Sequence, residues 1–299
     1  MAPLLARLGL GRSGFGFSKK SGPKSVTIIS TFSSPGSVAI PAQATSVKVT
    51  AHGSKRGHIF GETFLRKDGG LAEGTFSTLQ GNTLNVNFAG GGTPHLTPSF
   101  ANEGAHYAGV FNGPVTHANS LVIAGGSGSR GSQNFGPVLG GAGGSSTGES
   151  GDQGVKLVFD GNPNGGVLAG GGGGGTQASG GAGGSPGSPR IPAMGSGDGN
   201  PGTALQGGAG APGNQGTNVG ANCGGGGGGY YGGGGGGGGG GYAPYLDGGN
   251  APSPDMNGSG GGGGGGSNYI HPTASNITNT RGGSLYSAGY VEITVIAPS

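Results

Sequence analysis

Alternating apolar and polar residues predict β-strands in the first part of the chain. Apolar side chains recur at every second position in residues 26–32, 47–50 and 84–88, and Gly, Pro, Ser or Asn residues lie beside these segments. A period of two is typical of a strand with one face buried. In the second segment we therefore expect Val47 and Val49 to point into the core and the polar residues beside them to point outward.

Other segments carry the same kind of signal. Residues 38–40, 155–159 and 290–296 read as strands, and two short apolar segments, residues 121–126 and 166–171, run directly into glycine. No segment longer than about eight residues shows the periodicity of an amphipathic helix. The sequence therefore predicts an all-β fold.

A glycine-rich block at residues 165–266 interrupts this pattern. It contains uninterrupted glycine runs at residues 170–175, 224–229, 232–241 and 260–266. Glycine loses more backbone freedom on folding than any other residue and has no side chain to bury. One interpretation, suggested by 84 glycines and 19 prolines, is a disordered linker. The other is a set of extended three-fold helices that pack side by side and hydrogen-bond to one another. The strand that follows the block favours the ordered alternative.

Composition narrows the classes of function. The formal net charge is +3, too small to imply a nucleic-acid partner, and no apolar run is long enough to insert in a membrane. Cys223 is the single cysteine, so neither a disulfide framework nor a thiolate metal cluster is expected, and the six histidines show no ligand spacing. We expect no metal and no cofactor.

Catalytic motifs occur only as fragments. Residues 9–14 fit GxGxxG without a preceding strand, and residues 144–148 fit GxSxG without a strand-to-helix elbow. Residues 160–165 open like a calcium loop but lack the closing glutamate, since Gly171 stands there. Such matches arise by chance in a glycine-rich chain, and we expect no enzyme.

The order of several motifs resembles that of phage glycine-rich domains. The motifs lie in residues 32–50, 74–88, 120–126 and 289–293, with the glycine runs before the last of them. The resemblance covers residues 26–299 and is shared by glycine-rich tail-fibre and tip proteins and, less well, by some animal receptor kinases.

This resemblance implies a jelly-roll-like β-sandwich framework with an inserted polyglycine II helix bundle. The framework would comprise residues 26–165 and 284–299, and residues 166–283 would form the bundle with its tip loops. Residues 1–25 would be a basic N-terminal arm that attaches the protein to the virion, although a disordered tail is the alternative. The basic residues expected to make that attachment are Arg7, Arg12, Lys19 and Lys20.

The resemblance also implies a function. We expect a phage virion structural protein, a fibre or tip adhesin on the tail or capsid exterior, that presents loops between glycine rods to a bacterial surface receptor. The alternative is a capsid or tail decoration protein without receptor binding. The expected partners are other virion proteins and further copies of the chain, with a trimer favoured.

The expected recognition loops are residues 242–259 and 267–281. Exposed aromatic side chains make good recognition anchors, whereas tyrosines that interrupt the rods, such as Tyr230 and Tyr231, are expected to pack over the rod ends. The candidate receptor-binding residues are Tyr242, Tyr245, Leu246, Asp247, Tyr269 and His271. For the tyrosines among them, packing over a rod end is an equal alternative.

Overall fold

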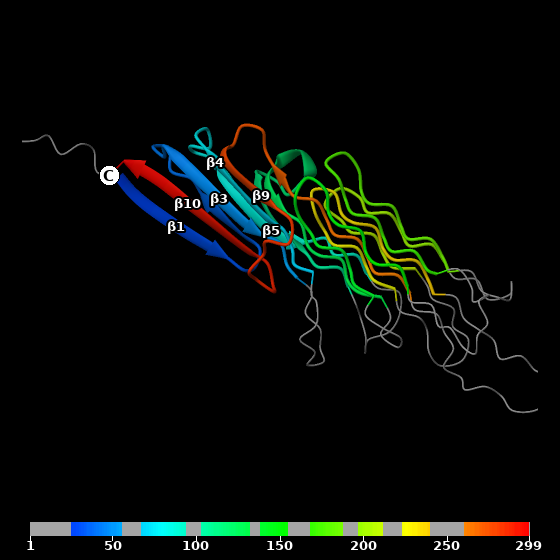
Figure 1. Cartoon of the computed structure of the whole chain (residues 1–299). Helices are drawn as coiled ribbons and strands as arrows, with labels where there is room; N and C mark the ends of the chain where they lie inside the picture. Colours follow the sequence, from blue (N-terminus) through cyan, green and yellow to red (C-terminus); the bar gives the residue numbers. More distant parts are fainter. Residues whose placement is uncertain are drawn as a thin grey trace, which may run out of the picture.

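The protein is all-β, as predicted. The computed structural model describes residues 25–55, 67–93, 103–131, 138–154, 168–187, 197–211, 223–239 and 260–298. In these ranges the chain forms two antiparallel five-stranded sheets, and its helical structure is one short 3-10 turn, η1 (His117–Asn119) (Figure 1).

Each sheet combines strands from distant parts of the sequence. Sheet A has, in spatial order, β1 (Ser25–Phe32), β10 (Tyr290–Pro298), β3 (Ser46–His52), β4 (Leu71–Phe76) and β9 (Ser275–Thr280). Sheet B has β2 (Gly36–Ala39), β5 (Thr83–Ala89), β6 (Tyr107–Asn112), β7 (Ser120–Ala124) and β8 (Tyr269–Ile270). The last strand, β10, lies between β1 and β3, so the chain returns to an interior position of sheet A after the glycine runs.

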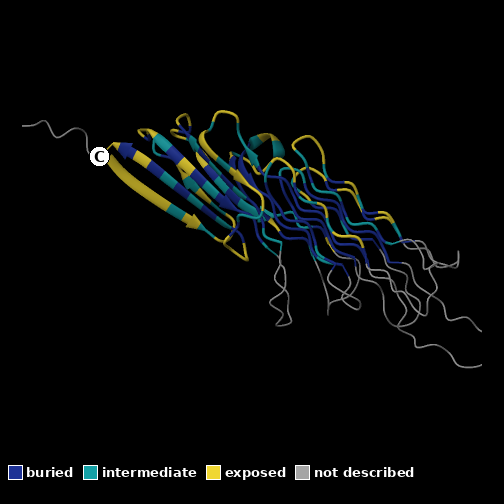
Figure 2. Ribbon diagram, in the orientation of Figure 1, coloured by how far each residue is buried: buried dark blue, intermediate teal, exposed yellow. Residues whose placement is uncertain are grey.

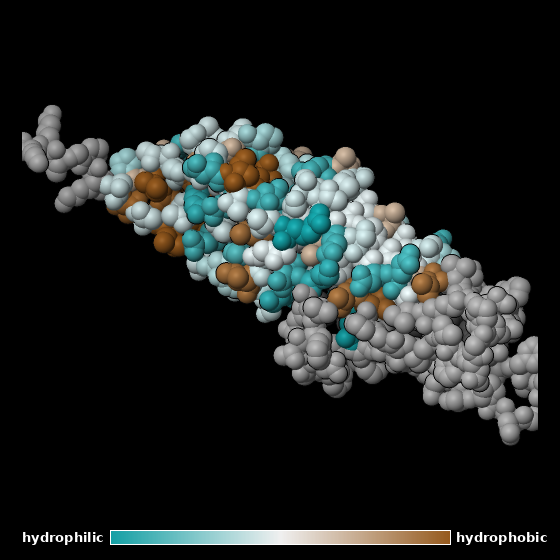
Figure 3. Space-filling view, viewed as in Figure 1, coloured by the Kyte–Doolittle hydropathy of each residue, from teal (hydrophilic) through white to brown (hydrophobic). Residues whose placement is uncertain are grey.

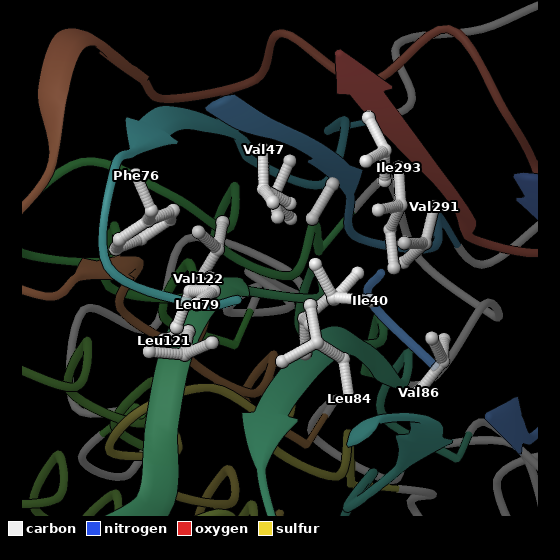
Figure 4. Packing of buried hydrophobic residues seen from close by; sticks show 14 of the residues in the cluster. Ile40, Val47, Phe76, Leu79, Leu84, Val86, Leu121, Val122, Val291 and Ile293 are labelled. Carbon is white, nitrogen blue, oxygen red and sulfur yellow. The ribbon is translucent and has the colours of Figure 1, made fainter. Parts of the chain in front are cut away.

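The two sheets enclose one apolar core. Val47 and Val49 of β3 are 1% and 0% exposed, which confirms that they point inward, and Lys48 between them is exposed. Leu84 of sheet B and Ile293 of sheet A are buried in the same cluster (Figure 4). Alternation thus arises in strands such as β3, which have one face buried and the other exposed.

Most of the predicted strands are present. The segments around residues 26–32, 38–40, 47–50, 84–88, 121–126 and 290–296 correspond to β1, β2, β3, β5, β7 and β10. Residues 155–159 lie outside the described residues. The strand β6 was not predicted, because it is buried on both faces and therefore shows no alternation, and β8 is only two residues long.

Glycine segments leave the sheets at one end of the strands. Glycine follows β3, β5 and β7 directly, and glycine lies within three residues before β4, β6 and β8. As Figure 1 shows, the molecule is elongated, with the sheets at one end and the glycine segments beside one another at the other.

The boundary between these two parts differs from the expected one. The strands β8 and β9 lie within residues 166–283, which were assigned to the bundle, yet they pair with β7 and β4. Conversely, residues 125–131 and 138–154, assigned to the framework, are hydrogen-bonded among the glycine runs. The chain passes between the two parts repeatedly, so no single position in the sequence separates them.

Candidate functional site: the glycine segments and their two ends

The donors of segment 260–267 bond to different neighbours with a period of three residues. Its N–H groups bond in turn to segments 232–239, 148–154 and 125–131. The pairs, donor first, are Gly261–Gly237, Gly264–Gly234, Gly262–Asp152, Gly265–Glu149, Gly263–Ser129 and Gly266–Gly126, with N···O distances of 2.8 to 3.0 Å. Neighbouring segments, rather than the segment itself, satisfy these groups.

The carbonyl groups of the same segment follow the same period. They accept from segments 223–229, 170–175 and 138–144. The pairs, donor first, are Gly224–Gly261, Gly227–Gly264, Gly172–Gly262, Gly175–Gly265, Gly141–Gly263 and Gly144–Gly266. This segment is therefore hydrogen-bonded to six neighbours within the described part of the chain.

Glycine is required on every side of such a segment. A Cβ atom on Gly262, Gly263 or Gly264 would lie 2.1, 2.1 or 2.0 Å from a backbone oxygen, and each oxygen belongs to a different neighbour. Successive residues of this segment thus face different neighbours. An interior segment therefore has no direction in which a side chain fits, which explains its unbroken glycine run.

Segments at the surface need glycine on fewer sides. In segment 180–187 the buried residues are Gly181, Gly184 and Gly187, whereas Ala182 and Ser185 are exposed. Figure 2 shows the corresponding change from buried interior segments to exposed outer ones. The buried glycines of this segment are three residues apart, with other residue types between them. This spacing distinguishes a segment at the surface of the bundle from an interior segment, which has an unbroken glycine run.

Several described segments lie side by side in the part of the bundle that is remote from the sheets (Figure 1). Gly187 donates to Gly238 at 2.9 Å, Gly238 donates to Gly197 at 3.0 Å, and Ala211 donates to Gly236 at 2.9 Å. These residues adjoin the parts of the chain that follow residues 187, 211 and 239. We call the region formed by Gly187, Gly197, Ala211, Gly236 and Gly238 the far end of the bundle.

Two groups of predicted site residues belong to ranges that the structure does not describe. Tyr242, Tyr245, Leu246 and Asp247 lie outside the described residues, as do the N-terminal residues Arg7, Arg12, Lys19 and Lys20. The described residues on either side of the first group, Gly239 and Gly260, adjoin segments that meet at the far end: Gly261 donates to Gly237 at 3.0 Å, next to the bonds of Gly238.

Tyr269 and His271 lie at the opposite end, where the sheets meet the bundle. The ring of Tyr230 stacks between the rings of Tyr269 and His117. The distances between ring centroids are 4.0 Å to Tyr269 and 3.9 Å to His117. Burial raises the pKa of Tyr269 and lowers that of His117. Residues 267–281 were expected to form a loop, but they form β8 and β9. The structure therefore does not bring Tyr269 and His271 to the far end.

Asn268 joins the two parts of the molecule and was not singled out from the sequence. It is 0% exposed, and its Oδ1 accepts from the Gly125 N–H at 2.8 Å. Its Nδ2 donates to the Leu71 carbonyl and to Asn279 Oδ1, both at 2.9 Å, and to the Thr280 carbonyl at 3.2 Å. A single amide thus connects β4, β9 and the first residue after β7.

Among the described residues, no group of three or more His, Cys, Asp or Glu side chains could hold a metal ion. Within the same residues, no helix has the length and apolar character needed to cross a membrane. Comparison with protein-family models and with curated proteins gave no match to the chain.

The thiol of Cys223 gives a test of burial in the bundle. Cys223 is 0% exposed, and burial raises its pKa to about 12. At pH 8 only about one thiol in ten thousand would then be ionised, so a disulfide reagent should react with the native chain only as fast as it opens. The reaction should be immediate in denaturant. Complete reaction of the native protein within seconds would show that residue 223 is accessible.

Proposed function

We propose that the glycine segments form a polyglycine II bundle inserted in a jelly-roll-like sandwich. The support for the bundle is the three-residue repeat of the hydrogen bonds, because an extended three-fold helix has three residues per turn and no internal hydrogen bonds. The support for the sandwich is its connections, since the links from β1 to β2, from β2 to β3 and from β4 to β5 cross between the sheets.

We further infer that the protein is a structural component of a phage virion, a fibre or tip adhesin. The observation that carries this inference is the far end, where several described segments are hydrogen-bonded side by side. Binding residues in proteins are often found on loops held by a rigid scaffold. In this proposal the bundle is the scaffold, the residues after Gly239 contact the bacterial surface, and the N-terminal arm contacts other virion proteins.

Deletion of residues 242–259 tests the proposed recognition. Fluorescently labelled protein is added to a panel of bacterial strains, and bound fluorescence is measured on single cells. We expect the intact protein to bind one strain and replacement of residues 242–259 by a short Gly-Ser linker to reduce binding at least tenfold. The matched control is Leu285→Ser, which changes the 80% exposed Leu285 near the sheets and should bind normally.

Two results would contradict this assignment. Normal binding after the deletion would place recognition elsewhere, and an intact protein that binds no strain would favour a capsid or tail decoration protein. Circular dichroism of each variant, compared with the intact protein, separates loss of binding from loss of folding.

A further inference from the structure

The strand β1 differs from the other three edge strands of the sheets. Natural edge strands avoid pairing with other chains by being short, bulged or charged. The edge strands β2 and β8 have four and two residues. The edge strand β9 has an irregular register with β4 between Glu73 and Thr75, and its Asn276 has a φ of 49°. In contrast, β1 pairs with β10 along all eight of its residues without a shift.

Charge protects neither face of β1, and packing against the core is limited to its end at Phe32. The strand contains no charged residue, and its burial pattern is exposed along most of its length (Figure 2). On the core-side face Val26 and Ile28 are 45% and 43% exposed, and on the outer face Ile29 is 60% exposed. Ile296 of the adjacent β10 is 39% exposed. Figure 3 shows hydrophobic groups gathered at the end of the molecule where β1 and β10 lie.

We propose that β1 pairs with β1 of a second copy of this chain. The two strands lie antiparallel across a two-fold axis and make sheet A continuous through the dimer. In the register that places Ile29 opposite the partner's Ile29, Val26 lies opposite the partner's Phe32 and Thr27 opposite the partner's Thr31. In this register the core-side residues of one β1 lie opposite core-side residues of the other, and the outer residues lie opposite outer residues.

This register suits the residues of β1. Pairs of an aromatic with a β-branched residue and pairs of threonines stabilise antiparallel strands when they lie directly opposite one another. No like charges meet, because β1 has none, and Lys48 of sheet A is paired with Glu73 at 2.9 Å. A self-complementary, uncharged edge favours a second copy over a charged partner. The pairing predicts a dimer in place of the trimer expected from the resemblance.

The mass of the full chain in solution tests the pairing. Light scattering should give about twice the chain mass of 28.1 kDa. Ile29→Lys should return the mass to that of one chain, because it places two lysines opposite each other at the axis. The matched control is Ile277→Lys on β9, where Ile277 is 55% exposed on the other edge of sheet A; it should leave the dimer intact. A monomeric intact chain, or a dimer that survives Ile29→Lys, would overturn the proposal.

Cross-linking tests the register independently of stability. Under mild oxidation Ile29→Cys should form a covalent dimer, since residue 29 meets itself at the axis. Thr27→Cys, also on the exposed outer face, should not, because residue 27 lies four residues from its counterpart, roughly 13 Å along the strand. The buried Cys223 should not interfere. Equal cross-linking of both variants, or of neither, would contradict this register. A dimer that forms only when residues 1–24 are removed would instead assign the edge to that segment.

Discussion

Replacing Gly174 by alanine is expected to destabilise the protein by about 3 kcal/mol, at the upper end of the cost of overpacking a close-packed interior. A Cβ atom at this position would lie 1.9 Å from the carbonyl oxygen of Gly148. The clash is with backbone, and that backbone is itself hydrogen-bonded, since Gly148 donates to Gly175 at 2.8 Å. The segments must therefore separate to admit one methyl group. Thermal unfolding should show a decrease of about 5 °C or more.

The adjacent Gly173 provides the control. It belongs to the same glycine run and is also half-buried, but a Cβ atom there would lie 3.1 Å from the nearest atom, the nitrogen of Ala182. Gly173→Ala should change the free energy of unfolding by less than about 1 kcal/mol. The slight crowding destabilises the folded state, but alanine also lowers the conformational entropy of the unfolded chain, and the two effects offset each other. If both variants unfold at the temperature of the unmodified protein, the segments are not packed as described.

Asn268→Ala is expected to be at least as destabilising, by about 3 kcal/mol or more. The change leaves the Gly125 N–H without its acceptor and the carbonyls of Leu71 and Thr280 without this donor. A buried polar group that loses its partner costs about 1–3 kcal/mol. Because the amide connects both parts of the molecule, hydrogen exchange should also become faster in β9 and in the residues after β7.

Asn119→Ala is the matched control for this change. It removes the same side chain, but the amide of Asn119 makes one exposed hydrogen bond, to the Pro114 carbonyl at 2.9 Å. Water can replace that bond, so the expected loss is below about 1 kcal/mol. Equal effects of the two substitutions in chemical denaturation would contradict the role assigned to Asn268.

The strands that could be predicted are those with one buried face. In β3, β5 and β10 the alternation of Val, Leu and Ile with polar residues follows the sandwich directly. The strand β6 is buried on both faces and contains Gly109, where a Cβ atom would lie 2.6 Å from Ile123. Neither feature produces a period of two. Local patterning therefore predicted the fold class and part of the framework.

The long-range arrangement could not be predicted in the same way. The glycine runs indicated packed segments, but which ends of the segments lie together depends on how often the chain returns to the sheets. Asn268 illustrates this limit, because its partners Gly125 and Leu71 are 143 and 197 residues away along the chain. The residues on either side of it give no indication of such contacts.

Hydrogen bonds between neighbouring segments order the glycine-rich part of the chain. Hydrogen exchange of the glycine amides, measured by NMR on protein labelled at glycine, tests this ordering most directly. Amides of Gly233–Gly236 and Gly261–Gly265 each donate to another segment at 2.8 to 3.0 Å. We predict that they exchange as slowly as the amides of β10 and that all are lost together on unfolding. Exchange at the rate of an unfolded chain, with β10 still protected, would show a disordered glycine linker on a folded sandwich.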